Sequence, residues 1–134
     1  MKATEITKRY HDSRNGRDAD ALVAQFTKDG TFCNPDTYPG IGGEDLANFV
    51  KGLWTSVPDF SIELLNAGEI EPNLVAHHWI VRGTDTGPRA DGSQPTGRSF
   101  SIKGASIIQI EKGKIHSEQC YFDRKGLDKQ LEPK

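Results

Sequence analysis

Hydrophobic residues in the first half of the chain recur with helical spacing. In residues 4–13 the pattern places Ile6 and Tyr10 on one face, and Asn15-Gly16 then interrupts it. The clearest helix is predicted over residues 44–57, because its apolar residues form a single stripe. These residues are Leu46, Phe49, Val50, Leu53 and Trp54.

The segment between these two helices predicts a further helix and a short strand. Asp18 is a suitable N-cap, and apolar residues recur at i, i+3, i+4 and i+7 over residues 19–26. Gly30 is typical of a helix C-terminus. We expect the strand to cover residues 31–34, because Pro35 lacks the N–H that a continuing ladder requires.

From Phe60 onward the hydrophobic period changes to two, which is typical of strands. Further strands are predicted over residues 73–86, 98–110 and 114–122. Helices therefore come first and strands last. This order predicts the α+β class, with an antiparallel sheet and helices packed on one face. The length fits one domain over residues 1–134.

Charge and composition exclude several classes of partner. Seventeen Lys and Arg against nineteen Asp and Glu leave a formal charge of −2, so we expect no nucleic-acid partner. No apolar run reaches the roughly 18 residues of a spanning helix, and the N-terminal segment does not resemble a signal peptide. We therefore expect a cytoplasmic protein without a membrane partner. Cys33 and Cys120 form no CxxC pair, so no disulfide framework or metal site is expected.

Several short motifs occur in a fixed order along nearly the whole chain. They are FTKDGTFCNP at 26–35, VPD at 57–59, GTDTG at 83–87, PTGR at 95–98, GKI at 113–115 and YFD at 121–123. In this order they resemble the SnoaL-like polyketide cyclase group of the nuclear-transport-factor-like and ketosteroid-isomerase-like superfamily. The resemblance implies a cone-shaped α+β barrel in which helices and a strongly curved, mainly antiparallel sheet enclose a pocket. It also implies a homodimer. Its members include cyclases, isomerases, dehydratases and proteins without known activity.

In SnoaL-like cyclases, the last strand carries the catalytic pair, which is a His and, two residues later, an Asp. Here these positions hold Glu118 and Cys120, and a spacing of two places both on one strand face together with His116. A thiol is the poorer acid/base group, so we expect Glu118 to carry any proton transfer, with burial in an apolar cone raising its pKa. Alternatively, Glu118 pairs with Lys103 or Arg82 across the sheet, or faces solvent.

Similarity to the ketosteroid isomerases adds three polar positions. Tyr10 matches their oxyanion-stabilising tyrosine, whereas Asn34 and Ser106 stand where the isomerases have a basic and a protonated aspartate. An amide or a hydroxyl can hydrogen-bond a ligand oxygen, but neither is a useful base near neutral pH. We therefore expect these three residues to orient ligand oxygens.

Only one side chain of the pair His77-His78 can enter the cavity, because neighbouring strand residues point to opposite faces. Alignment with the isomerases turns His78, Ile80 and Arg82 inward, and a bulge would reverse this. His78 is then a candidate acid/base group and Arg82 a candidate ligand contact.

The remaining candidates lie at the expected rim and wall of the cavity. Asp36 and Tyr38 fall in a loop, where either turn formation or ligand contact explains them. Phe49 and Trp54 are expected in the cavity wall.

Together the candidates favour a cofactor-free pocket for a small apolar or aromatic metabolite. An enzyme of this kind would catalyse cyclisation, isomerisation or dehydration of a polyketide-like substrate. The alternative is a non-catalytic ligand-binding or dimerisation module of the same fold. A purely structural domain would instead have its cone filled by side chains.

Overall fold

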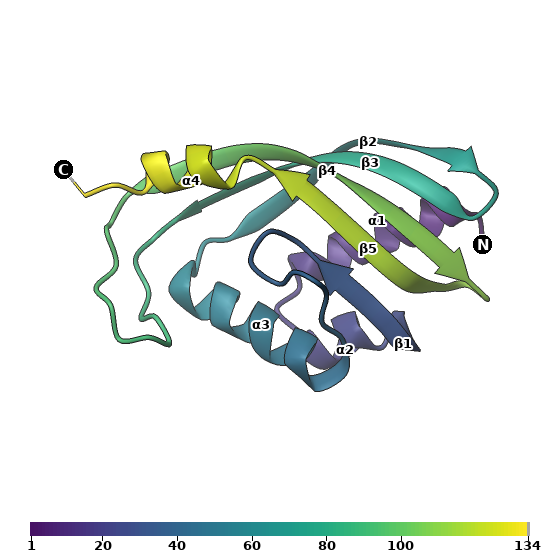
Figure 1. Cartoon of the computed structure of the whole chain (residues 1–134), viewed down its shortest axis with the longest axis horizontal. Coiled ribbons are helices and arrows are strands. Elements are labelled where there is room, and N and C mark those ends of the chain that lie inside the picture. Colours follow the sequence, from purple (N-terminus) through teal and green to yellow (C-terminus); the bar gives the residue numbers. More distant parts are fainter. Residues whose placement is uncertain (134) are drawn as a thin grey trace.

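The computed structural model describes residues 1–133, and the last residue of the expected domain, Lys134, lies outside this range. The described chain forms four helices and five strands. Their bounds are α1 (Ala3–Arg14), α2 (Ala19–Val23), β1 (Phe26–Cys33), α3 (Gly43–Ser56), β2 (Ser61–Glu71), β3 (Leu74–Thr84), β4 (Ser99–Glu111), β5 (Lys114–Phe122) and α4 (Arg124–Gln130). Figure 1 shows a long curved sheet with α1, α2 and α3 on one face.

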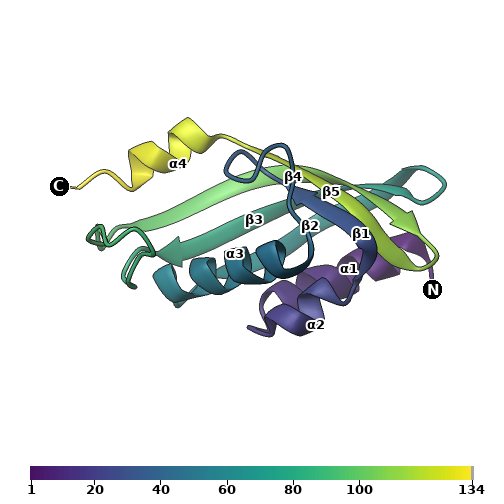
Figure 2. The same cartoon turned by 60° about the horizontal axis from the view of Figure 1, so that its bottom comes forward.

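The five strands form one sheet in the order β1-β5-β4-β3-β2. Neighbours from β2 to β5 are antiparallel, whereas β1 pairs with β5 in parallel. Figure 2 shows the three N-terminal helices beneath the sheet and α4 at the end away from the N-terminus. The predicted α+β architecture with a mainly antiparallel sheet is thus confirmed, and β1 is the parallel exception.

The segment after Asp18 differs from its prediction. The helix ends at Val23, and the strand already begins at Phe26. Phe26 is buried in either arrangement, but as a strand residue it pairs with Ile115 of β5 and packs edge-on against the Tyr10 ring. Gly30 serves close strand approach rather than helix capping, because a Cβ there would meet the Ile115 carbonyl oxygen at 2.9 Å.

The core lies between the helices and the inner face of the sheet. Its largest fully buried apolar side chains are Tyr10, Leu22, Leu46, Val50, Val75, Ile108 and Ile115. Within residues 1–133, no helix combines the length and the apolar character needed to cross a membrane. A cavity lies within this core, and its lining includes Arg14 of α1 and Leu127 of α4.

Candidate functional site

A cavity of about 130 Å³ opens between the inner face of the sheet and α3, with α4 at its mouth. This volume is well above the roughly 10–15 Å³ that one water molecule requires. The cone is therefore not filled by its own side chains. Its apolar wall is formed by Phe32, Phe49, Leu53, Phe60, Ile62, Trp79, Val81, Phe100, Ile102, Phe122 and Leu127, and its polar lining by Arg14, Asn34, Asp36, Cys120 and Arg124.

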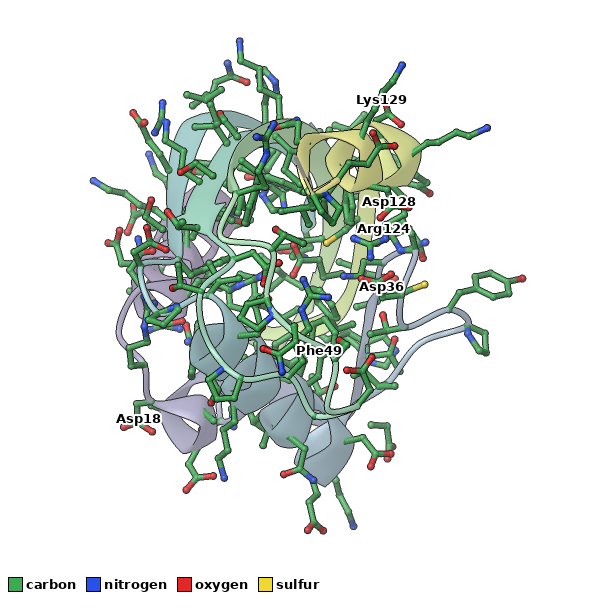
Figure 3. All side chains as sticks on the ribbon, turned by 90° about the vertical axis from the view of Figure 1, so that its left-hand side faces the viewer. Asp18, Asp36, Phe49, Arg124, Asp128 and Lys129 are labelled. Atoms are coloured by element: carbon green, nitrogen blue, oxygen red, sulfur yellow. The ribbon has the colours of Figure 1, made fainter. Side chains whose placement is uncertain are left out.

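At the mouth of the cavity, an ion pair connects the loop after β1 with the start of α4. Asp36 Oδ1 lies 3.3 Å from Arg124 Nε, and Arg124 Nη2 lies 3.4 Å from Asp128 Oδ1. Figure 3 views this end directly and shows Asp36 and Arg124 facing each other beside α4. Asp36 is thus a rim residue, as expected.

Asn34 and Tyr38 have different positions in the same loop. Asn34 lines the cavity, but its Oδ1 accepts hydrogen bonds from the backbone N–H groups of Asp36 and Thr37 and from the Thr37 hydroxyl. Its carbonyl oxygen therefore stabilises the turn. Tyr38 is 80% exposed and lies outside the lining, so its expected ligand contact is wrong in this structure.

The inner end of the cavity holds a buried cation, Arg14, which sequence reasoning missed. Its Nη1 donates to Tyr10 Oη at 3.3 Å and lies 3.8 Å from Glu118 Oε1. Its Nε is buried without a hydrogen-bond partner, and the guanidinium carbon lies 5.5 Å from the centre of the Phe32 ring. One signal could have revealed Arg14, since it follows Tyr10 by four residues on the same helix face.

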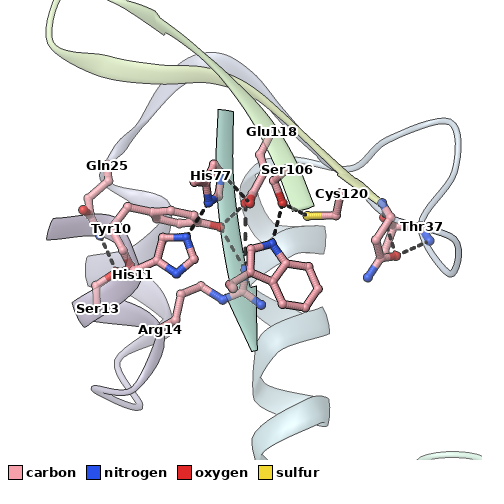
Figure 4. A network of polar contacts seen from close by, with 12 residues as sticks. Tyr10, His11, Ser13, Arg14, Gln25, Thr37, His77, Ser106, Glu118 and Cys120 are labelled. Atoms are coloured by element: carbon pink, nitrogen blue, oxygen red, sulfur yellow. Dashed lines mark hydrogen bonds and ion pairs between the residues drawn. The ribbon is translucent and has the colours of Figure 1, made fainter. Parts of the chain in front are cut away.

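Tyr10 connects Arg14 to Glu118. The Tyr10 hydroxyl donates a 2.6 Å hydrogen bond to Glu118 Oε1 while it accepts from Arg14 (Figure 4). Glu118 is buried on the inner face of β5, and it pairs with Arg14 rather than with Lys103, Arg82 or solvent. It does not belong to the cavity lining, whereas its neighbours Arg14 and Cys120 do.

Two histidines extend this network away from the cavity. His11 Nε2 lies 2.6 Å from His77 Nδ1, and His77 Nε2 lies 3.6 Å from Glu118 Oε2. Burial, together with the neighbouring His77, lowers the pKa of His11 to about 3. Burial also lowers the pKa of His77, although Glu118 opposes the shift. Both rings are therefore neutral near pH 7. The tautomer with His11 Nε2–H donating is favoured, because it turns the His77 Nε2–H toward the carboxylate.

Burial and neighbouring charges also set the pKa values of the other ionisable groups at the inner end. Burial and the Glu118 charge raise the pKa values of Tyr10 and Cys120 well above their ordinary ranges, so both side chains are neutral. Burial alone would lower the pKa of Arg14, but Tyr10 and Glu118 outweigh it and raise that pKa. Arg14 is therefore a permanent cation, and Cys120 presents an uncharged thiol to the cavity.

The face of β3 is opposite to the expected one. His77, Trp79 and Val81 point inward, whereas His78 and Arg82 lie on the outer face. Arg82 is exposed and donates to Glu63 Oε1 of β2 at 3.2 Å. The expected roles of His78 and Arg82 in the site are therefore wrong, because a change of one residue in register moves every side chain to the other face.

A bulge in β5 separates His116 from Glu118 and Cys120. Ile115 pairs with Ile110, but Ser117 already pairs with Gln109, so one extra residue is inserted. His116 consequently lies at the surface, where its Nδ1 is 3.0 Å from Glu111 Oε2. The predicted common face holds for Glu118 and Cys120 only.

The remaining predicted site residues are Ser106, Trp54 and Phe49. The fully buried Ser106 hydroxyl accepts from Trp79 Nε1 at 2.9 Å and donates to Cys120 Sγ at 3.1 Å, so it supports the wall from behind. Trp54 is buried in α3 but lies outside the lining, contrary to expectation, whereas Phe49 lines the cavity as expected. Among residues 1–133, no group of three His, Cys, Asp or Glu side chains is arranged to hold a metal.

The fold and the site together describe a conical α+β domain with a buried cation, Arg14, in the lining of an apolar cavity. The chain belongs to the SnoaL-like polyketide cyclase family, whose model matches residues 4–131. This confirms the resemblance read from the motifs.

Solved structures show the same fold. AclR from Streptomyces galilaeus is 19% identical with a TM-score of 0.79, over 96% of this chain and 80% of its own. TsrD from Streptomyces laurentii is 23% identical with a TM-score of 0.77, over 96% and 92%. SalBIII, an epoxide hydrolase/cyclase-like enzyme of pyran ring formation in the polyether salinomycin, is 20% identical with a TM-score of 0.73, over 92% of both chains.

Proposed function

We propose that this chain binds a compact, mainly apolar or aromatic metabolite whose carbonyl oxygen faces Arg14. We further propose that it acts on this polyketide-like compound as a cofactor-independent cyclase, isomerase or dehydratase. One observation carries the proposal: a buried guanidinium with unused donor capacity lies at the inner end of an otherwise apolar cavity.

Such a cation suits reactions in which negative charge develops on a carbonyl oxygen. A donor that is already in place, in surroundings of low dielectric, stabilises an oxyanion without reorganising at the moment of reaction. Tyr10 and Glu118 hold Arg14 in place from behind. SalBIII, which has the same fold, is described as an epoxide hydrolase/cyclase-like enzyme, and this description agrees with cyclisation as one of the proposed reactions. The expected acid/base role of Glu118 stays a prediction.

A second candidate is a non-catalytic ligand-binding protein. It is favoured by the positions of the two carboxylates of the site. Glu118 lies outside the cavity lining, and Asp36 lies at the mouth, paired with Arg124. Neither carboxylate is free on the inner wall, where a proton would have to be removed from a bound ligand.

Deuterium exchange of a bound ketone separates the two candidates. We would incubate 2-tetralone with the protein in D2O and follow loss of its α-proton signals by NMR, together with its binding. An enzyme should accelerate exchange, and Arg14→Lys should slow it by about tenfold to a hundredfold, because lysine cannot reproduce the planar donor array. Arg82→Lys, on the outer face, is the matched control and should leave the rate unchanged.

The outcomes differ for each candidate. Binding without accelerated exchange would favour the non-catalytic protein, and absence of binding for a panel of aromatic ketones would overturn the proposed pocket function. Glu118→Gln tests the acid/base prediction in the same assay. The homodimer and the cytoplasmic location also stay predictions.

A further inference from the structure

The charges around the cavity indicate which ligands it accepts. We infer that Glu118 determines the charge selectivity of the pocket: by pairing with Arg14 it leaves the inner end electrically neutral, so that uncharged oxygenated ligands bind and carboxylates do not. The inference rests on the proposed function of the cavity as a ligand site. It makes Glu118 a specificity-determining residue that acts through Arg14.

The pair at the inner end is shielded from solvent. The side chains of Arg14 and Glu118 are 9% and 1% exposed, and their charged atoms approach to 3.8 Å. The Tyr10 hydroxyl bridges them, donating to Glu118 and accepting from Arg14. Because both charges lie in the same low-dielectric region, each offsets the field of the other inside the cavity.

The surrounding titratable groups add no charge near pH 7. His11 and His77 are neutral because burial lowers their pKa values. Tyr10 and Cys120 are neutral because burial and Glu118 raise theirs. The inner end therefore has one positive and one negative charge.

The mouth offers no surplus cation either. Arg124 is the second cation of the lining in the described chain, and it already pairs with Asp36 and with Asp128. A ligand carboxylate would thus find each lining cation already balanced by a carboxylate of the protein.

A bound carboxylate would lose its hydration without gaining an unpaired cation, and it would lie near Glu118 behind Arg14. Burying an ion without a partner is strongly unfavourable, whereas a carbonyl oxygen is less costly to desolvate and needs only a hydrogen bond. The guanidinium retains donors for such an oxygen, since it has five N–H groups. Selection against carboxylates follows from this difference, because a carboxylate must lose its hydration on entry, whereas negative charge that develops on an already bound ketone has no hydration shell to lose.

The test uses 2-acetylnaphthalene and 2-naphthoate, which share one ring system and differ in charge. Affinities would be measured by ligand-observed NMR at pH 7.5 for the full chain. The native protein should prefer the ketone by about tenfold or more. Glu118→Gln should reverse the preference, because Arg14 then lacks its counter-charge. Glu63→Gln removes the same charge from the outer face and should leave the ratio unchanged.

A second variant covers the case in which Glu118→Gln does not fold. Replacing both members of the pair, Arg14→Met with Glu118→Met, removes both charges and should retain the rejection of 2-naphthoate while weakening ketone binding. Equal affinities in the native protein, or an unchanged ratio in Glu118→Gln, would overturn the inference alone. Failure of both probes to bind any of these proteins would overturn the proposed pocket function, and the inference with it.

Discussion

The Tyr10 hydroxyl is a neutral group that contacts both Arg14 and Glu118. It donates to Glu118 and accepts from Arg14, so its removal leaves a carboxylate oxygen and a guanidinium N–H without that partner. A buried group left unsatisfied costs more than an average hydrogen bond contributes, because its lost hydration is not replaced. Loss of the Tyr10 hydroxyl oxygen should therefore lower the stability of the protein.

Tyr10→Phe should consequently lower the free energy of unfolding by about 1–3 kcal/mol, since the ring still fills its space and only the hydroxyl is lost. Urea denaturation measures the change. Tyr121→Phe is the matched control, because Tyr121 is 58% exposed, and it should have little effect. Equal, small changes in both variants would contradict the network seen around Tyr10.

Individual site residues could be predicted from the sequence where they belong to a recognisable motif. Tyr10, Asn34, Phe49, Glu118 and Cys120 all lie in or directly behind the cavity. Arg14 could not be found in this way, because a basic residue near a helix C-terminus has an ordinary explanation in the helix dipole. Its surroundings include Phe32 of β1 and Glu118 of β5, and Glu118 lies far away in sequence.

At the scale of elements, the strands show what a hydrophobic pattern does and does not determine. The predicted ranges 98–110 and 114–122 match β4 and β5 within one residue. The inward face of β3 could not be read in the same way, because both of its faces carry buried residues, including Trp79 inside and Ile80 outside. The bulge before Glu118 is likewise a property of strand pairing.

Gly104 of β4 lies where the chain packs closely beside the cavity wall. A Cβ on Gly104 of β4 would overlap the Trp79 ring and lie 2.8 Å from the Tyr121 carbonyl oxygen. Gly104→Ala should therefore destabilise the protein by about 1–3 kcal/mol through overpacking. Trp79 also lines the cavity, so the same variant should weaken ligand binding.

Gly52→Ala is the contrasting variant. Gly52 lies within α3 and a Cβ there meets open space, so alanine should stabilise the protein by about 0.5–1 kcal/mol. Thermal or urea unfolding of both variants gives the comparison. A Gly104→Ala protein as stable as the native one would show that Trp79 can move without cost.

At the scale of the whole molecule, the two buried histidines join α1 to the sheet. His11 belongs to α1 and His77 to β3, and their 2.6 Å contact lies on the inner side of both elements. The packing tolerates them only as neutral rings, because a charge there would be desolvated. The stability of the fold is therefore linked to pH.

The direction of this linkage follows from the lowered pKa values. Unfolded histidine takes up a proton near pH 6.5, whereas folded His11 does so only near pH 3. Between these values the unfolded state binds more protons. The stabilisation is complete above pH 6.5 and declines as the pH falls, by about 1.4 kcal/mol per pH unit for His11. His77 acts in the same direction.

Urea denaturation at intervals from pH 7.5 to pH 5 should therefore show stability falling below about pH 6.5. This range avoids Asp59 and Asp85, whose lowered pKa values make their stabilisation decline only at more acidic pH. The double variant His11→Phe with His77→Leu should flatten the curve, because neither replacement binds a proton. Tyr121→Phe, at the exposed end of β5, changes no group that titrates in this range and should leave the slope as it is. A native protein equally stable at pH 7.5 and pH 5 would contradict the neutral buried pair.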